Sequence, residues 1–256
     1  MAPPTSTIKN RLLAGLPADD LAQLIGHLQP VDLPKKRVIY EVGAPLDHIY
    51  FIENGVASVL TMMEDGATSE VGMVGREGMI GVSALLGGRA SAQHIVMQLP
   101  GTAHHISAPR CKAVFDQSPG VRSVLLRFIE DVLNLSSQTA ACNRLHSVEQ
   151  RTARWLLMAS DRLDSHFLPL TQEFLAAMLG VRRSGVSEAA GELQRSGLLR
   201  YRRGQITIID REGLEKTACE CYHLDHQRMG HPLSAPPNFL VTNCNNVRYG
   251  TDKRLM

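Results

Sequence analysis

Residues Leu168–Asp210, LPLTQEFLAAMLGVRRSGVSEAAGELQRSGLLRYRRGQITIID, predict two short helices followed directly by a β-hairpin. Thr171 can cap a first helix over 172–179, and Gly180 supplies a sharp turn after it. The second helix has an apolar face made of Val186, Ala189, Ala190 and Leu193. A buried helix, a glycine turn, a second helix with a polar outer face and a hairpin together indicate a winged helix-turn-helix.

Positive charge is concentrated on this stretch. Between Arg182 and Arg203 there are six arginines and two glutamates, a local net charge of +4, whereas the whole chain carries +2. Such a local excess is the electrostatic footprint of DNA binding, although a solvated charged face is the ordinary alternative. The residues predicted to contact DNA are Thr171, Arg182, Arg183, Ser184, Ser187, Glu188, Arg195, Arg200, Arg202 and Arg203.

The N-terminal half has a different pattern. Leucines at helical spacing predict helix over 8–28, interrupted by Pro17. From Val31 onward, short apolar stretches alternate with turn residues, which indicates an antiparallel β-roll. The dipeptides Asn54-Gly55 and Asp65-Gly66 are strong hairpin signals. The predicted fold class is therefore α+β, with an N-terminal antiparallel β-roll and a C-terminal winged helix-turn-helix.

A long helix is expected between these two parts. Apolar residues at alternating spacings of four and three favour a parallel dimer seam; they are Val121, Leu125, Phe128, Val132 and Leu135. The alternative is a helix packed on its own domain. Ser147-x-x-Gln150 fits a capping box, so a new helix is expected to begin there, after a break near His146.

These patterns divide the chain into four segments. We expect an effector-type roll with flanking helices over 1–118, a dimerisation helix over 119–146, and a DNA-binding domain over 147–222. The remainder, 223–256, is rich in Pro, Asn, His and Arg with little periodicity, which predicts a disordered tail.

Composition excludes several classes of protein. The N-terminus lacks a secretory signal, and no apolar run approaches the ~18 residues of a membrane span, so a cytoplasmic protein without a membrane partner is expected. Five scattered cysteines (Cys111, Cys142, Cys219, Cys221 and Cys244) do not predict a disulfide framework, and the C-x-C pair is not a usual zinc motif. We expect free thiols, no metal site and no cofactor. With no catalytic motif of a common kind, an enzyme is not expected.

The order of roll, long helix and winged helix-turn-helix resembles the Crp/Fnr family of bacterial transcription regulators over about residues 8–222. The matching pieces are Glu41–Val59, Gly75–Gly88 and, more specifically, LTQEFLAAMLGVRRSGVSEAAGELQRSGLL. The resemblance implies a homodimer on a two-fold-symmetric DNA site that contacts RNA polymerase.

The sequence departs from the family at the positions that hold a cyclic nucleotide. Where such members carry Gly-Glu and Arg-Ser or Arg-Thr, this chain has Gly81-Val82 and Ser91-Ala92. Val82 cannot accept a hydrogen bond, and Ser91 carries no charge to pair with a phosphate. A standard cyclic AMP site is therefore not expected. The residues of a possible pocket for another effector are Gly81, Val82, Ser83, Arg89, Ser91 and Ala92.

Two further departures lie in the second helix, where Ser184 and Glu188 stand at positions that are Glu and Arg in familiar members. The target sequence of those members is therefore not carried over. Two alternatives stay open: a regulator gated by another small molecule or a redox signal through the roll, and a sensing or protein-interaction module whose basic helix is incidental.

Overall fold

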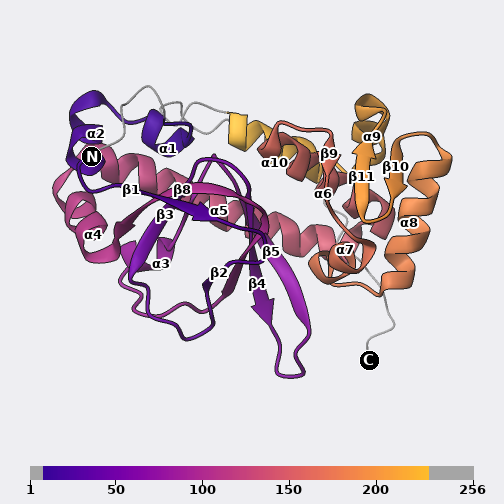
Figure 1. Cartoon of the computed structure of the whole chain (residues 1–256), viewed down its shortest axis with the longest axis horizontal. Coiled ribbons are helices and arrows are strands. Elements are labelled where there is room, and N and C mark those ends of the chain that lie inside the picture. The colour runs from indigo at the N-terminus through magenta and orange to yellow at the C-terminus, as the bar shows by residue number, and fades with distance from the viewer. Residues whose placement is uncertain (1–7, 231–256) are drawn as a thin grey trace, which may run out of the picture.

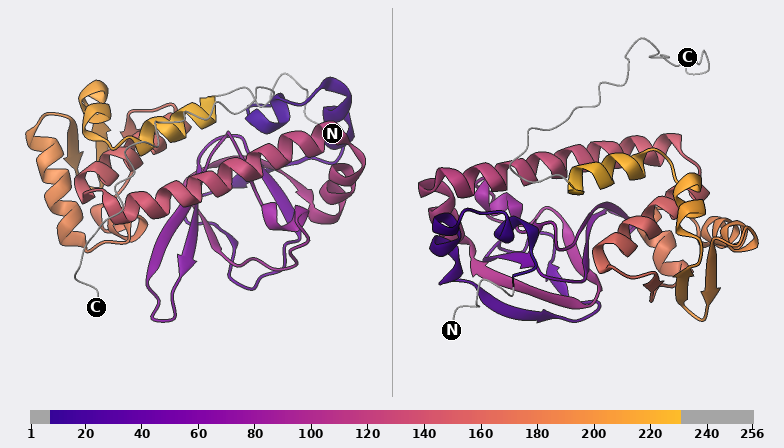
Figure 2. Two further views of the ribbon diagram at one scale, coloured as in Figure 1. Left: turned by 180° about the vertical axis from the view of Figure 1, so that it is seen from behind. Right: turned by 90° about the horizontal axis from the view of Figure 1, so that it is seen from above.

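The computed structural model describes residues 8–230. A β-roll lies at one end of the molecule and a mainly helical module at the other, and the long helix α5 (Pro119–Leu145) runs along both (Figures 1 and 2). The expected α+β architecture is confirmed.

Two short helices open the chain, and the predicted interruption at Pro17 separates them. They are α1 (Arg11–Ala14) and α2 (Ala18–Ile25), separated by a break at Gly15–Pro17. Asn10 caps α1, and its buried side chain donates hydrogen bonds of 2.8 Å to the carbonyls of Ile52 and Gly78. This amide therefore joins the first helix to the roll.

The roll consists of two four-stranded antiparallel sheets. The first sheet has the order β1 (Gln29–Leu33), β8 (Gly101–Ser107), β3 (His48–Ile52), β6 (Met79–Ile80). The second has the order β2 (Val38–Tyr40), β7 (His94–Leu99), β4 (Val56–Met62), β5 (Thr68–Val74). Both sheets contribute buried apolar side chains to one shared core, among them Leu33, Ile52 and Met97. The predicted antiparallel roll is therefore confirmed.

The two predicted hairpin turns have different outcomes. Asp65-Gly66 connects β4 to β5 as a hairpin, with Met62 opposite Thr68. Asn54-Gly55 connects β3 to β4, which belong to different sheets, so the hairpin expected there is wrong. Gly55 has φ +83°, and a Cβ there would lie 2.7 Å from the Leu99 carbonyl oxygen. The dipeptide thus specifies a left-handed backbone at a crossing between sheets, and not strand pairing.

Helix α5 packs part of the predicted dimer seam inside the chain. Val121, Leu125 and Phe128 are buried in a core of their own domain, together with residues of α1, α2 and α4 (Ala108–Gln117). Val132 packs against that same core, and Leu135 packs against the core of the C-terminal module. Val121, Leu125 and Phe128 are therefore buried within one chain, which fits the alternative of a helix packed on its own domain, whereas the half-buried Val132 and Leu135 stay predicted seam residues.

The C-terminal module begins at the predicted break. His146 has an extended backbone, and Ser147 and Gln150 form the capping box of α6 (Val148–Leu163). The other elements are β9 (Phe167–Leu168), α7 (Gln172–Leu179), α8 (Arg183–Arg195), β10 (Leu199–Arg202), β11 (Gln205–Ile208), α9 (Arg211–Thr217) and α10 (Cys221–Gly230). Residues 223–230 are therefore helical and not disordered, while 231–256 lie outside the described residues.

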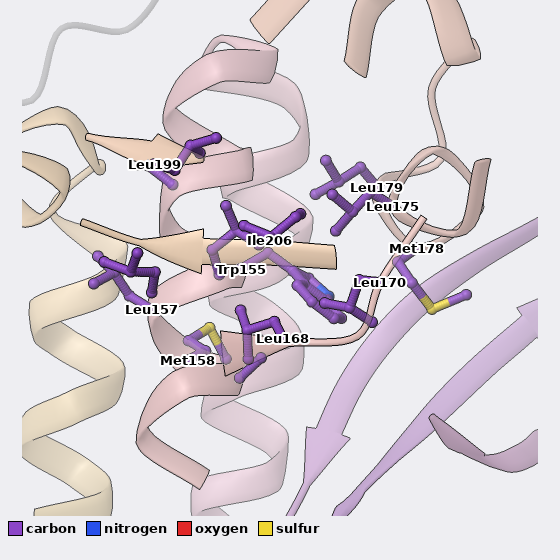
Figure 3. Close-up of a cluster of buried hydrophobic side chains, with 14 of the residues drawn as sticks. Trp155, Leu157, Met158, Leu168, Leu170, Leu175, Met178, Leu179, Leu199 and Ile206 are labelled. Carbon is purple, nitrogen blue, oxygen red and sulfur yellow. The ribbon is translucent and has the colours of Figure 1, made fainter. Parts of the chain in front are cut away.

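One apolar core unites this module. Figure 3 shows Trp155 of α6 surrounded by side chains of α7, β9 and β11, including Leu168, Leu175 and Ile206. The same cluster includes Leu60 and Met73 of the roll, so the core extends across the boundary between the two parts.

Polar contacts cross this boundary as well. Trp155 Nε1 donates to Glu70 Oε1 of β5 at 2.7 Å, and Arg162 Nε donates to Glu77 Oε1 at 2.8 Å. Glu70 is buried and also accepts a hydrogen bond from Ser58 Oγ. Burial raises the pKa of Glu70 from 4.5 to about 7, although its two hydrogen bonds and Arg162 favour the charged form.

The first prediction concerns the stability contributed by Glu70. The folded protein binds this proton up to about pH 7, whereas the unfolded chain releases it near pH 4.5. Stability should therefore fall as the pH rises through this window. Glu70→Gln is uncharged, keeps an acceptor for Trp155, and pairs its NH2 group with the Ser58 hydroxyl, which then accepts, so it should abolish up to roughly 3 kcal/mol of this pH-dependent loss. Urea unfolding of both proteins between about pH 5 and about pH 8 measures it. A difference between them that does not change with pH would contradict the prediction.

Candidate nucleic-acid interface

The turn between α7 and α8 depends on one glycine. Thr171 Oγ1 accepts from the Phe174 amide and caps α7, and the helix ends at Gly180, which has φ +61°. A Cβ at Gly180 would lie 3.1 Å from Ser69 Oγ of β5. The predicted helix, glycine turn and second helix are all present, and the turn lies against the roll.

Helix α8 has one buried and one exposed face. Its buried residues are the predicted stripe of Val186, Ala189, Ala190 and Leu193. The exposed residues include Arg182, Arg183, Ser184, Glu188 and Arg195. α8 lies at the edge of the molecule farthest from α2 (Figure 1). The N-terminal turn of α8 is thus open to a partner.

Ser187 makes a contact that the sequence did not predict. Its hydroxyl is half-buried and donates to Gln172 Oε1 of α7 at 2.7 Å. This bond joins the two helices of the motif, so Ser187 positions α8 against α7.

The β10–β11 hairpin forms the wing. Arg203 and Gly204 at its tip both have positive φ, +49° and +77°, as a tight two-residue turn requires. Arg200, Arg202 and Arg203 are exposed. The hairpin therefore extends the positive surface of α8.

Three residues that sequence reasoning missed hold the wing in place. The Tyr201 hydroxyl accepts from the Gln172 amide at 3.3 Å, and Gln194 Oε1 accepts from the Tyr201 amide at 2.8 Å. Their sequence signal is only that of polar side chains on a helix or strand, which is not specific. These bonds tie the wing to both helices.

The predicted effector-pocket residues do not all lie in one environment. Gly81 has φ +96° and precedes α3 (Val82–Leu85), where Val82 packs against the apolar core. The Ser91 hydroxyl donates to the Gln93 carbonyl at 2.7 Å. The exposed members are Ser83, Arg89 and Ala92. A cavity of about 290 Å³ on the roll is lined by other residues, including His48, His105 and Arg110.

The positions of the cysteines differ from the scattered arrangement expected from the sequence. Cys142, Cys219 and Cys221 are not scattered but converge with His146, and the four potential ligand atoms lie within 4.8 Å of one another. Cys111 is buried in the separate core beneath α4 and α5. Sequence spacing could not predict this convergence, because Cys142 and Cys219 are 77 positions apart.

Residues 150–217 match the Crp-like helix-turn-helix domain, and residues 30–118 match the cyclic nucleotide-binding domain. Together the two segments cover more than half of the chain, in the order that the fold shows. The chain belongs to the Crp/Fnr family of transcription regulators. Regulators of this kind bind DNA and act as dimers.

Curated relatives agree with this assignment. A CRP-like cAMP-activated global transcriptional regulator of Mycobacterium tuberculosis is 24% identical over 216 residues, covering 81% of this chain and 96% of its own length. An anaerobic regulatory protein of Pasteurella multocida is 22% identical, covering 75% of this chain and 72% of its own length.

Solved structures share the fold. FixK2 from Bradyrhizobium japonicum has a TM-score of 0.65 at 17% identity, covering 75% of this chain and 98% of its own. A CRP/FNR-family regulator from Thermus thermophilus has a TM-score of 0.63 at 23% identity, covering 74% and 98%. Among the described residues of this regulator, no helix is long and apolar enough to cross a membrane.

The second prediction tests the glycine turn. Gly180→Ala should lower the free energy of unfolding by about 1–2 kcal/mol, because an alanine at φ +61° is strained and its Cβ meets Ser69. Gly191→Ala is the control: Gly191 lies inside α8, and a Cβ added there would meet no neighbouring residue within 4 Å, so it should stabilise by about 0.5–1 kcal/mol. Denaturant unfolding measures both, and equal effects of the two substitutions would exclude this role for Gly180.

Proposed function

We propose that this Crp/Fnr regulator reads DNA through the N-terminal turn of α8 and holds the phosphate backbone through the wing. The main support for this proposal is an exposed surface of arginines. Arg182 and Arg183 lie at the start of α8, and Arg200, Arg202 and Arg203 lie on the wing. Arginine donates bidentately to guanine, and each good pair discriminates against the wrong base by about 1–3 kcal/mol. Ser184 and Glu188 lie on the same exposed face, so they contribute to base choice.

The exposed face of α5 supports a homodimer. Leu126 and Leu133 are 43% and 65% exposed and lie seven residues apart, followed after another seven by the exposed Ala140. A seven-residue repeat keeps these side chains on one face of a helix. Two copies joined along this face would place two α8 helices on half-sites ~34 Å apart. RNA polymerase is the further partner that the family resemblance implies; a transcription assay on the selected site detects that contact.

We also infer that the roll does not bind cyclic AMP in the manner of the family's nucleotide-binding members. Val82 is apolar and packs on the protein core, and the Ser91 hydroxyl is already bonded to Gln93. Neither side chain supplies the carboxylate or the guanidinium that the resemblance places at these positions. The name of the M. tuberculosis relative describes that protein as activated by cAMP, and we do not extend this property to the present chain.

The third prediction tests the DNA-reading surface. Selection from random DNA should yield a two-fold-symmetric site, and the combined change Arg182→Ala and Arg183→Ala should weaken binding to it by at least about tenfold. Cyclic AMP should leave the affinity of the unsubstituted protein unchanged. The control is Arg37→Ala with Arg110→Ala, which removes the same charge from exposed positions on the roll.

Fluorescence anisotropy at several salt concentrations gives the affinities, because phosphate contacts make binding salt-dependent. If both double variants weaken binding equally, the role of α8 is refuted. If no sequence is enriched by selection, the proposed function itself fails.

The fourth prediction concerns the dimer face. Leu133→Glu places a charge in the centre of the proposed interface, so the variant should be monomeric at concentrations where the unsubstituted protein is a dimer. Leu86→Glu is the control, because Leu86 is similarly exposed, at 61%, but lies on the roll. Sedimentation equilibrium measures the masses. A dimeric Leu133→Glu variant would place the interface elsewhere.

A further inference from the structure

Three cysteines and one histidine meet where the C-terminal end of α5 touches the start of α10. Cys142 lies in the last turn of α5, His146 caps that helix, Cys219 follows α9, and Cys221 begins α10. The three cysteines are at most 1% exposed. We propose that Cys142, His146, Cys219 and Cys221 form a tetrahedral Zn²⁺ site that fastens α10 to α5.

The distances between the ligand atoms fit one metal ion. Cys142 Sγ and Cys219 Sγ are 3.6 Å apart, and Cys221 Sγ is 3.6 Å from His146 Nδ1. With Zn–S bonds of about 2.3 Å and Zn–N bonds of about 2.0 Å, the edges of a tetrahedral site are about 3.8 Å for S···S and about 3.5 Å for S···N. The sulfurs are too far apart for a disulfide, whose S–S bond is about 2.05 Å.

The donor set selects the class of metal. Three thiolates and an imidazole are soft or borderline ligands, which favour Zn²⁺ over Mg²⁺, Ca²⁺ or Mn²⁺. All four positions come from the protein, which is the arrangement of structural zinc sites and not of catalytic ones. Binding would release the thiol protons to solvent.

The surroundings of the cluster are those of a metal centre. His146 directs Nδ1 toward Cys221, and its Nε2 lies 3.3 Å from Glu220 Oε1. A carboxylate on the second ring nitrogen fixes the orientation of a metal-binding histidine. Gln138 Nε2 donates to Cys221 Sγ at 3.0 Å, which stabilises a thiolate at that position.

The charge of a nearby arginine fits the same site. Arg151 is buried, and its Nε has no hydrogen-bond partner in the described part of the chain. Burial penalises the charged guanidinium and lowers the pKa of Arg151. Zn²⁺ with three thiolates and a neutral imidazole carries a single net negative charge, which would compensate a buried guanidinium.

The position of the site gives it a structural consequence. α6 begins directly after His146, and α10 lies along α5 (Figure 2, right view). Bonds from one ion to both helices would hold the DNA-binding module at a fixed angle to α5. If the module binds DNA as proposed above, on which this step rests, zinc would thereby strengthen DNA binding.

The fifth prediction is one Zn²⁺ per chain. Elemental analysis of the full-length protein, purified without chelators under reducing conditions, gives the metal content. Cys219→Ser and Cys221→Ser should lose the metal, whereas Cys111→Ser, which alters an equally buried cysteine in another core, should retain it. Glu220→Ala should lower zinc affinity by about tenfold, the smaller end of such effects because Glu220 is exposed.

Measurements on the unsubstituted protein keep the proposal testable if a cysteine variant does not fold. Co²⁺ added to the stripped protein should give the visible absorption of a tetrahedral thiolate site, and Zn²⁺ should displace it. Hydrogen exchange should show that Zn²⁺ protects the amides of α10. A stripped protein that binds neither metal would overturn the proposal, as would a Cys142–Cys219 disulfide or an iron–sulfur chromophore in the purified protein.

DNA affinity with and without Zn²⁺ separates this inference from the proposed function. Stoichiometric zinc without any selective DNA binding would leave the site intact and refute the function. Selective DNA binding without any zinc would do the reverse. If zinc binds and DNA affinity does not change, the site stands and its effect on DNA binding is refuted.

Discussion

The arrangement of this protein depends on the buried contact between Trp155 and Glu70. The indole fills the core of the DNA-binding module, and its one polar atom donates to a carboxylate on β5 of the roll. Because Glu70 is buried, any separation of the two parts would expose apolar surface and leave the indole and the carboxyl to find new partners. This contact, together with the Arg162–Glu77 ion pair, places α7 against the roll and leaves α8 exposed.

The features that sequence predicted best were local ones. Thr171, Gly180 and the capping box at Ser147 each act within a few residues, so their patterns determine helix ends regardless of what packs around them. The wing turn and the Asp65-Gly66 hairpin are of the same kind. The helix-turn-helix could therefore be recognised, with its exposed arginines, before any tertiary contact was known.

The features that failed depend on which surfaces meet. The spacing of Val121, Leu125 and Phe128 correctly indicated an apolar stripe, but a stripe does not specify whether its own domain or a second copy covers it. Asn54-Gly55 specified a backbone conformation and not the sheet on either side. Cys142 and Cys219 come together only because α10 returns along α5. The hydrogen bond of Ser187 to Gln172 could not be predicted either, because Gln172 lies on the other helix.

The position of the cysteine and histidine cluster also determines how the DNA-binding module can move. The chain enters the module just after His146, and it returns to the same corner at Cys219 and Cys221, where the last helix of the module begins. The module can turn about this corner only if its contacts with the roll, Trp155–Glu70 and Arg162–Glu77, are broken. α8 lies at the outer edge of the module (Figure 1), so a small rotation at the corner becomes a large arc at α8. In the proposed dimer, such a rotation would change the distance between the two recognition helices without any change inside the module.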